Sequence, residues 1–462
     1  MAILRVYALP HPVLAIPAVG RGGEREIKKT LKAFDHVAKE IARLRPDTII
    51  FLTPHNVIYD DYFHISPGEG GVGNCEDFGT KHVKLSLKYD PNYAAAVAHL
   101  SAEYDITAKT RGKRTAPLDH GVMVPLWFIN RRYTKFKAMR ISPSGLSIRH
   151  HYRMGQCLQE AASNLGRRTV VIASGNLSDN LGNKAESDLL DESLEYDREM
   201  LFVFSTGEFD RLLAVPRAHW ESADACGHLV FAMMAGCLDR RIINANLLSY
   251  DNTMGEGYAV ASFNPGPPDE RRNFLERSQS MQRRLVMKSR ADEDAYCTLA
   301  RRALEHMVLH GIPMPVPSGL PQEMLHTRAG VFVSLYVDGK LRGAAGALGP
   351  TADHVAAEIV QYAVQVGQGD KRFHAVAREE LAELVYKVDV IGNPEPVEDA
   401  SELDPQLYGL IITSGDTWGV MLPNQDGVET GEEQIAAVML KAGIEKDAPM
   451  RLERFHVHRH EY

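Results

Sequence analysis

Residues 48–56 read TIIFLTPHN, an apolar run that is closed by a proline and a histidine. The run is short and rich in β-branched and aromatic residues, which is typical of a buried strand. Residues 3–9 predict a similar strand, and apolar side chains at helical spacing predict a helix over residues 25–44. Strand, helix and strand within about 50 residues form a βαβ unit. We therefore expect an α/β domain with a central mixed sheet flanked by helices.

The same alternation of strands and helices continues to about residue 263, where residues 258–263 predict a last strand. The next five residues read NPGPP, and the charged stretch that follows has few apolar positions. We interpret residues 264–290 as a linker. The alternative is a C-terminal helix of the first domain. Residues 291–462 predict a second, α+β domain, so the expected domains are 1–263 and 291–462.

The composition excludes several classes of protein. The chain has 462 residues, of which 52 are basic and 60 acidic, and its formal net charge is −8. A nucleic-acid binder needs a basic surface to replace phosphate counterions, so nucleic acid is not expected as a general partner. The five cysteines form no CxxC pair, which argues against a disulfide framework and favours a reducing compartment. No apolar run approaches the ~20 residues that span a bilayer. We expect a cytoplasmic protein without a membrane partner.

Two histidines follow predicted strands. His11 lies in the sequence PHP at 10–12, and His55 lies in TPHN at 53–56. Ligands of open α/β sheets bind at the carboxyl ends of strands, so two imidazoles there can begin a metal site. The alternative is that both are hydrogen-bonded structural residues. Glu221 precedes an apolar helix and could add a carboxylate, or could serve only as a favourable charge at the helix N-terminus. Two histidines and one carboxylate form the facial triad of non-haem Fe(II) enzymes.

Five short motifs occur in a fixed order: PHP at 10–12, PH at 54–55, LDHGVMVPL at 118–126, SGNLS at 174–178 and ESADACG at 221–227. In this order they resemble class III extradiol dioxygenases, which are related to the protocatechuate 4,5-dioxygenase catalytic subunit (LigB). The Memo proteins share that fold. The resemblance covers about residues 1–263 and implies His11, His55 and Glu221 as metal ligands. It implies that His120 hydrogen-bonds bound oxygen or a substrate hydroxyl. The alternative for His120 is a histidine that anchors a loop.

The resemblance also implies a cofactor and partners. The expected metal is Fe(II), with Zn, Mn or Cu as other candidates. The expected substrate is a small catechol- or aminophenol-like aromatic that is opened with O2. A homodimer is implied as well.

One motif departs from the family. Its members commonly read Gly-Asp-Leu-Ser-His where this chain reads GNLSD at 175–179, so Asp179 replaces the family's acid/base histidine. Imidazole suits proton transfer because its reference pKa of ~6.5 lies near working pH, whereas that of aspartate is ~3.9. Asp179 could be the catalytic base if burial beside other carboxylates raises its pKa. It could instead be a fourth, anionic metal ligand, or it could mark a lost activity.

The second block carries GVFVSL at 330–335, LRG at 341–343, DKRF at 370–373, PEP at 394–396, YGLI at 408–411 and GVMLP at 419–423. In this order the motifs resemble the AMMECR domain, which is known to occur together with the dioxygenase-like domain. The family's Leu-Arg-Gly-Cys-Ile-Gly appears here with Ala344 in place of the cysteine. Alanine has no thiolate, so thiol chemistry is excluded at this position. Arg342 could bind an anion, but we expect a structural role.

Three functions follow as hypotheses. The first is an Fe(II)-dependent oxidoreductase that opens an aromatic ring with O2, with His120 and Asp179 as catalytic residues. The second is an oxygen-independent hydrolase, isomerase or lyase that uses the same metal site. The third is a non-catalytic, Memo-like metal-binding protein whose AMMECR domain recruits a partner.

Overall fold

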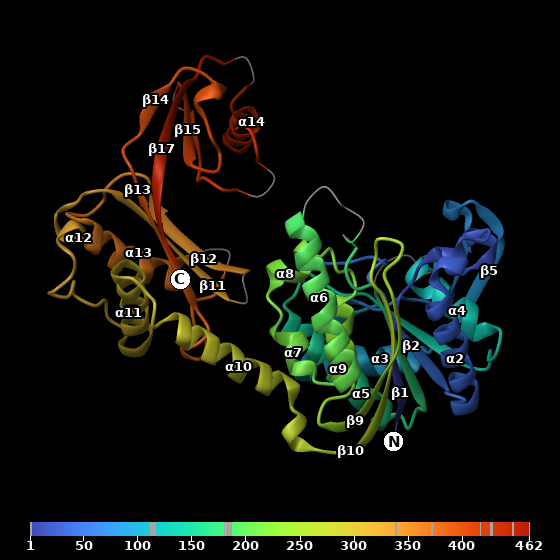
Figure 1. Ribbon diagram of the computed structural model, residues 1–462. Coiled ribbons are helices and arrows are strands. Elements are labelled where there is room, and N and C mark those ends of the chain that lie inside the picture. The colour runs from blue at the N-terminus through green and yellow to red at the C-terminus, as the bar shows by residue number, and fades with distance from the viewer. Residues whose placement is uncertain are drawn as a thin grey trace. The chain divides into compact units, whose positions relative to one another are not determined.

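The computed structural model describes residues 2–110, 117–179, 181, 187–337, 340–370, 373–415, 417–425, 428–445 and 448–461. The chain divides into two compact units, Met1–Met281 and Gln282–Tyr462 (Figure 1). The buried apolar side chains form two cores in the first unit and two in the second. Among these described residues, every helix is too short or too polar to cross a bilayer.

A six-stranded sheet organises the first unit. Its strands are β1 (Ile3–Leu9), β2 (Thr48–Leu52), β7 (Lys137–Ile141), β8 (Thr169–Ser174), β9 (Arg241–Asp251) and β10 (Tyr258–Pro268). They lie in the order β7–β2–β8–β1–β10–β9. The first four strands in this order are parallel, and β10 pairs antiparallel with both β1 and β9. The expected mixed sheet is therefore confirmed.

Helices cover both faces of this sheet, because its central strands are apolar on both sides. All five residues of β2 are buried, and its alternate side chains enter two separate cores. Ile49 and Phe51 pack with α2 (Lys28–Leu44) and α4 (His120–Asn130). Ile50 and Leu52 pack on the other face. The helices of that face are α3 (Pro91–Leu100), α5 (Ile148–Asn164), α6 (Ser187–Thr206), α7 (Phe209–Ala214) and α9 (His228–Gly236) (Figure 1).

Shorter elements connect these layers. Strand β3 (Phe63–His64) pairs in parallel with β6 (Ala108–Lys109), and β4 (Gly70–Cys75) forms an antiparallel hairpin with β5 (Thr80–Lys88). Two short helices, α1 (Pro17–Gly20) and α8 (Arg217–Ser222), complete the unit.

The segment predicted as a linker, residues 264–290, is largely regular structure. The expected break at residues 264–268 is wrong, because these residues complete β10, where Pro265 lies opposite Ile243 of β9. Helix α10 (Phe274–Ser289) follows, and Phe274 is buried in the core of the first unit. Arg277 of the same helix forms an ion pair of 2.9 Å with Asp210. The first part of α10 therefore packs as a C-terminal helix of the first unit, as the alternative interpretation expects.

The second unit is an α+β domain, as expected. Its sheet runs β12–β11–β13–β17–β15–β16, with β14 also paired to β17, and every pairing is antiparallel. The strands are β11 (Gly330–Val337), β12 (Lys340–Ala347), β13 (Val385–Ile391), β14 (Glu395–Val397), β15 (Tyr408–Ser414), β16 (Thr417–Met421) and β17 (Arg451–His460). The helices are α11 (Ala295–His310), α12 (Gln322–His326), α13 (Val355–Gly369) and α14 (Gly431–Ala442).

Arg342 on β12 has the structural role that we expected. Its guanidinium donates two hydrogen bonds to Glu380, of 2.8 and 3.0 Å, and one of 3.1 Å to the carbonyl of His374. Such a bidentate pair engages both oxygens of the carboxylate. The guanidinium therefore ties β12 to the loop that carries His374 and Glu380.

Two glycines let α5 and α9 cross closely below the sheet. A Cβ atom on Gly155 would lie 2.0 Å from the carbonyl oxygen of Met233, and one on Gly236 would lie 1.9 Å from that of Tyr152. The backbones of the two helices are therefore in direct contact. This contact fixes α9 and the loop that precedes it.

We predict that Gly155→Ala lowers the free energy of unfolding of the first unit by about 1–3 kcal/mol, because the methyl group overlaps backbone that cannot rotate away. The better helix propensity of alanine offsets only part of this loss. Denaturant titration measures the change. Ser163→Ala, at an exposed position of the same helix, should change stability by less than about 0.5 kcal/mol. Equal stability of the two variants would show that the helices are not in contact here.

Candidate metal centre

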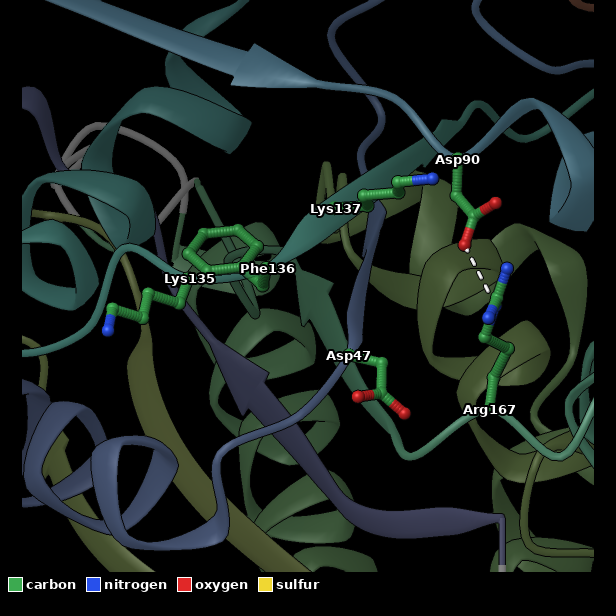
Figure 2. A pocket seen from close by; sticks show the side chains of 6 residues that line it. All are labelled: Asp47, Asp90, Lys135, Phe136, Lys137 and Arg167. Carbon is green, nitrogen blue, oxygen red and sulfur yellow. Dashed lines mark hydrogen bonds and ion pairs between the residues drawn. The ribbon is translucent and has the colours of Figure 1, made fainter.

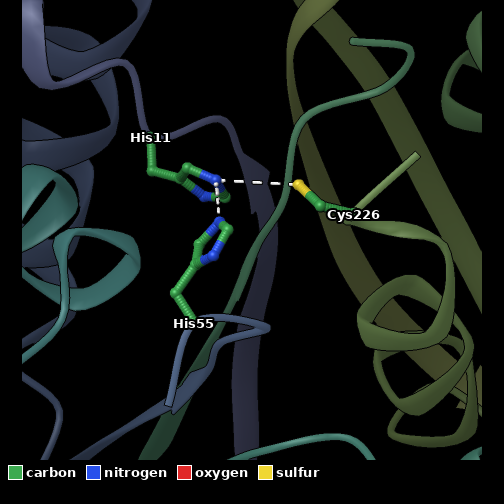
Figure 3. A group of neighbouring side chains, drawn as sticks. All are labelled: His11, His55 and Cys226. Carbon is green, nitrogen blue, oxygen red and sulfur yellow. Dashed lines mark hydrogen bonds between the residues drawn. The ribbon is translucent and has the colours of Figure 1, made fainter. Parts of the chain in front are cut away.

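The register of the sheet brings His11 and His55 together. Both β1 and β2 pair with β8, and Ala8 and Leu52 both lie opposite Ala173. His11 lies three residues after Ala8, and His55 lies three residues after Leu52, so both histidines lie just beyond the carboxyl ends of their strands. The two Nε2 atoms are 2.9 Å apart (Figure 3). The convergence that the sequence predicted for these two imidazoles is therefore present.

Cys226 completes a group of three candidate ligands. It lies in the loop before α9, and its Sγ is 3.7 Å from Nε2 of His11 (Figure 3). One ligand atom from each of His11, His55 and Cys226 lies within 4.8 Å of the other two. Typical Zn–N and Zn–S bonds in a tetrahedral site separate such atoms by roughly 3.3–3.6 Å. Two imidazoles and a thiolate therefore fit a divalent transition metal, with small movements of the side chains.

The structure does not bring Glu221 to this group. Glu221 lies on α8, its side chain is 44% exposed, and its carboxylate pairs with Arg217 one helical turn earlier. The group found among the described residues contains Cys226 instead. Both residues belong to the sequence ESADACG, so the candidate group contains a residue of the segment that the sequence indicated, but not the residue that the resemblance implies. The thiol was the available signal, because cysteine is a stronger ligand for many transition metals than an exposed carboxylate.

His120 lies beside the two histidines. It is the first residue of α4, and its ring centroid is 4.0 Å from that of His55 and 5.1 Å from that of His11. Burial lowers the pKa of His120, which keeps the ring neutral near pH 7. A neutral imidazole has one donor and one acceptor nitrogen, so His120 can hydrogen-bond a ligand of the metal.

Asp119 holds the two loops that carry His55 and His120. Its Oδ1 accepts hydrogen bonds from Thr53 Oγ1 at 2.6 Å and from the Val122 amide at 3.2 Å, which caps α4. Its Oδ2 pairs with Arg140 at 3.3 Å, and the Arg140 side chain is fully buried. Removing one partner of such a buried pair would leave an uncompensated charge. The contacts of Asp119 therefore hold the loop of His55 and the start of α4, where His120 lies, beside each other.

Asn176 joins three parts of the centre, and the sequence did not single it out as a site residue. Its Oδ1 accepts a hydrogen bond of 3.2 Å from the backbone N–H of His11, and its backbone N–H donates one of 3.3 Å to Cys226 Sγ. Its side-chain nitrogen donates to Glu256 at 2.7 Å. The residue is 4% exposed, so it links the loops of two candidate ligands from within the protein.

Asp179 follows β8 on the same loop. Burial, followed by the charge of Glu256, raises the pKa of Asp179 to about 7. Its Oδ1 is buried and has no hydrogen-bond partner among the residues that the structure describes. The elevated pKa agrees with the condition under which an aspartate can exchange protons near neutral pH.

The candidate ligands differ in their protonation. Burial and the neighbouring imidazoles lower the pKa of His11 well below its usual range, and the pKa of His55 falls to about 4. Burial and the charge of Asp179 raise the pKa of the Cys226 thiol far above its usual range. Both imidazoles are therefore neutral and ready to bind a cation at pH 7, whereas the thiol must first lose a proton.

A separate pocket of about 360 Å³ opens at the opposite edge of the sheet, where β2, β7 and β8 begin (Figure 2). Its lining residues are Asp47, Asp90, Lys135, Phe136, Lys137 and Arg167. Asp90 accepts hydrogen bonds from Thr48 and Arg167, and Asp47 accepts one from the Arg168 amide. Since these carboxylates are already engaged and the lining contains no histidine or cysteine, this pocket does not compete as the metal centre.

Two protein-family models match the chain. Residues 5–261 match the catalytic LigB subunit of aromatic ring-opening dioxygenase, and residues 297–461 match AMMECR1. Protein CA_C1420 of Clostridium acetobutylicum is 33% identical over the whole of this chain and 99% of its own length. A protein of Thermotoga maritima is 41% identical over 36% of this chain and 98% of its own length. Thus one relative shares both parts of the chain.

Two solved structures are also similar. The uncharacterised protein PH0010 of Pyrococcus horikoshii is 28% identical and covers 36% of this chain and 88% of its own, with a TM-score of 0.32. The uncharacterised protein JW3007 of Escherichia coli K12 is 14% identical and covers 56% of this chain and 99% of its own, with a TM-score of 0.36.

We predict that metal binding at this centre releases the proton of the Cys226 thiol, together with part of a proton from Asp179, whose pKa of about 7 a cation would lower. Between about pH 6 and 8 the dissociation constant for Co(II) should therefore fall by about tenfold or more per pH unit, because the thiol is protonated and both imidazoles are neutral in the free protein. Titration at several pH values measures the slope. Cys226→Ala should reduce the slope by about one proton per metal ion and weaken binding, whereas Glu221→Gln should change neither. If Glu221→Gln weakened binding and Cys226→Ala did not, Glu221 would be the third metal ligand.

Proposed function

This chain belongs, through residues 5–261, to the family of the catalytic LigB subunit of aromatic ring-opening dioxygenase, and from this we propose that it opens a small catechol- or aminophenol-like aromatic with O2. The observation that carries the proposal is the convergence of His11, His55 and Cys226, with His120 beside them, at the carboxyl ends of the parallel strands. Ligands of open α/β sheets bind at this edge.

The proposed ligands of the metal are His11, His55 and Cys226. Glu221 would have to leave its ion pair with Arg217 to take part, so we assign the third position to Cys226. Fe(II) bound there would activate O2 and lower the pKa of a coordinated substrate hydroxyl. Three protein ligands leave positions open for a substrate, as in other metal sites that catalyse reactions.

His120 would orient the substrate. Its ring is neutral near pH 7 and lies against the ring of His55, with 4.0 Å between the two ring centroids. One ring nitrogen can therefore donate a hydrogen bond to an oxygen of the substrate, while the other can accept one. Asp119 would hold this ring in position through the N-terminus of α4.

Asp179 would accept and return the proton that the family assigns to a histidine. Its pKa of about 7 lies close to the reference value of imidazole, ~6.5, so a substantial fraction is ionised at neutral pH. A cation at the neighbouring thiolate would lower the pKa of Asp179 from this raised value. We favour this role for Asp179 over a fourth metal ligand or a lost activity, because its elevated pKa meets the requirement of a base.

The thiol of Cys226 favours a second candidate function. Thiolate ligands suit Zn and Cu(I) better than a carboxylate does. With zinc, the same centre could activate a water molecule for hydrolysis, and Asp179 could again accept the proton. This function requires no O2.

The full chain loaded with Fe(II) under anoxia should consume O2 and yield a ring-opened product when air is admitted to a panel of catechols and aminophenols. Asp179→Asn should retain the metal but lower turnover about 100-fold or more, since general-base catalysis commonly contributes that much. The rate of the unmodified protein should rise with pH up to an inflection at or below about pH 7, because only the carboxylate form accepts a proton. Oxygen electrode and absorbance measurements follow both.

Absence of O2 uptake with every member of the panel would contradict ring opening. Turnover of a hydrolysable substrate by the zinc-loaded chain under strict anoxia would instead support the second candidate function.

A further inference from the structure

An aromatic side chain from a separate hairpin approaches the metal centre. Phe78 lies in the turn Glu76–Phe78 between β4 and β5, and its ring centroid is 5.7 Å from that of His120. The two rings are inclined by 74°, in an edge-to-face arrangement. His120 in turn lies 4.0 Å from His55. A continuous row of rings therefore leads from the tip of the hairpin to a candidate metal ligand.

Phe78 is not needed to fill the interior of the protein. It belongs to neither core of the first unit, and 36% of its surface is exposed. A large apolar side chain that is partly exposed beside a metal centre can gain stability by packing against a ligand. The free surface of this ring is thus available to a molecule that binds there.

The tip of the hairpin is held in place. Arg21 donates a hydrogen bond of 3.1 Å to the carbonyl of Gly79, and Asn74 Oδ1 accepts one of 2.9 Å from the amide of Glu76. Gly79 has a φ of 81°, a conformation that favours glycine and ends the turn directly after Phe78. Cys75, at the end of β4, is buried in the core. These contacts position the ring of Phe78 rather than leaving it to move with a free loop.

We propose that Phe78 determines the specificity of this centre for planar aromatic ligands, by packing its ring against theirs while the metal and His120 hold their oxygens. The inference rests on the proposed function and adds the residue that recognises the ring. A ring–ring contact adds an attraction beyond simple apolar burial. Phenylalanine at this position therefore discriminates between an aromatic ligand and a non-aromatic one that offers the metal the same oxygen donors.

The test compares two ligands of the Fe(II)-loaded full chain under anoxia. 4-Nitrocatechol offers two oxygens and an aromatic ring, whereas oxalate offers two oxygens and no ring. Phe78→Leu retains an apolar side chain of similar size without a ring, and Phe78→Tyr retains the ring. Absorbance titration gives the dissociation constant of 4-nitrocatechol, and competition gives that of oxalate.

We expect Phe78→Leu to weaken 4-nitrocatechol by roughly 3- to 10-fold, the range that an aromatic pair typically contributes. Phe78→Tyr should stay within about twofold of the unmodified chain, and oxalate and Fe(II) should bind all variants alike. Such a split between ligands would not arise if Phe78 only stabilised the fold.

Two results would overturn the inference alone: unchanged 4-nitrocatechol binding in Phe78→Leu, or an equal loss for both ligands, which would mean that the variant disturbs the metal centre itself. If the unmodified chain bound Fe(II) and oxalate but no 4-nitrocatechol, the proposed function would fail, and the role of Phe78 would fail with it.

Discussion

The pairing of β1 and β2 on either side of β8 is the constraint on which the centre depends. Because Ala8 and Leu52 share Ala173 as their partner, the two strands end at the same level, and the loops beyond them begin at equal height. A shift of either strand by one residue would reverse its inward and outward side chains. Since β2 is buried on both faces, packing in the two cores opposes such a shift. The register of the strands therefore holds the imidazoles of His11 and His55 at a fixed distance.

Hydrogen bonds from polar side chains also hold the loops that carry the candidate ligands. Asn176 connects His11, Cys226 and Glu256. Its side-chain amide donates a hydrogen bond to Glu256, which an ionised aspartate at this position could not do. An aspartate at this position would stand beside Glu256 and near Asp179, and three carboxylates would repel one another. The two departures from the family motif, Asn176 and Asp179, are thus electrostatically compatible: the amide removes one negative charge where the replacement of histidine adds one.

Much of the fold was predictable, because the parallel strands and the helices between them carry continuous or periodic apolar patterns. The apolar run that opens at residue 48 predicted a buried strand, and the structure has that strand over Thr48–Leu52. The hairpin of β4 and β5 was not, because Gly70, Gly71 and Gly73 have low β propensity and receive their partners from tertiary packing. His11 and His55 follow from strand ends, but the choice of Cys226 over Glu221 depends on which side of the short helix α8 faces the centre. Local sequence does not determine that orientation.

If Cys226 is the third metal ligand, as we propose, the state of this centre depends on the oxidants around it. In the free protein the Cys226 thiol keeps its proton, because its pKa is raised far above the usual range, and thiols react slowly with peroxides. Coordination would convert it to a thiolate, the form that proceeds to sulfenic and then sulfinic acid. Sensitivity to oxidants would thus arise when the metal binds. Oxidation of one sulfur atom would remove a metal ligand, whereas a carboxylate ligand is not oxidised in this way.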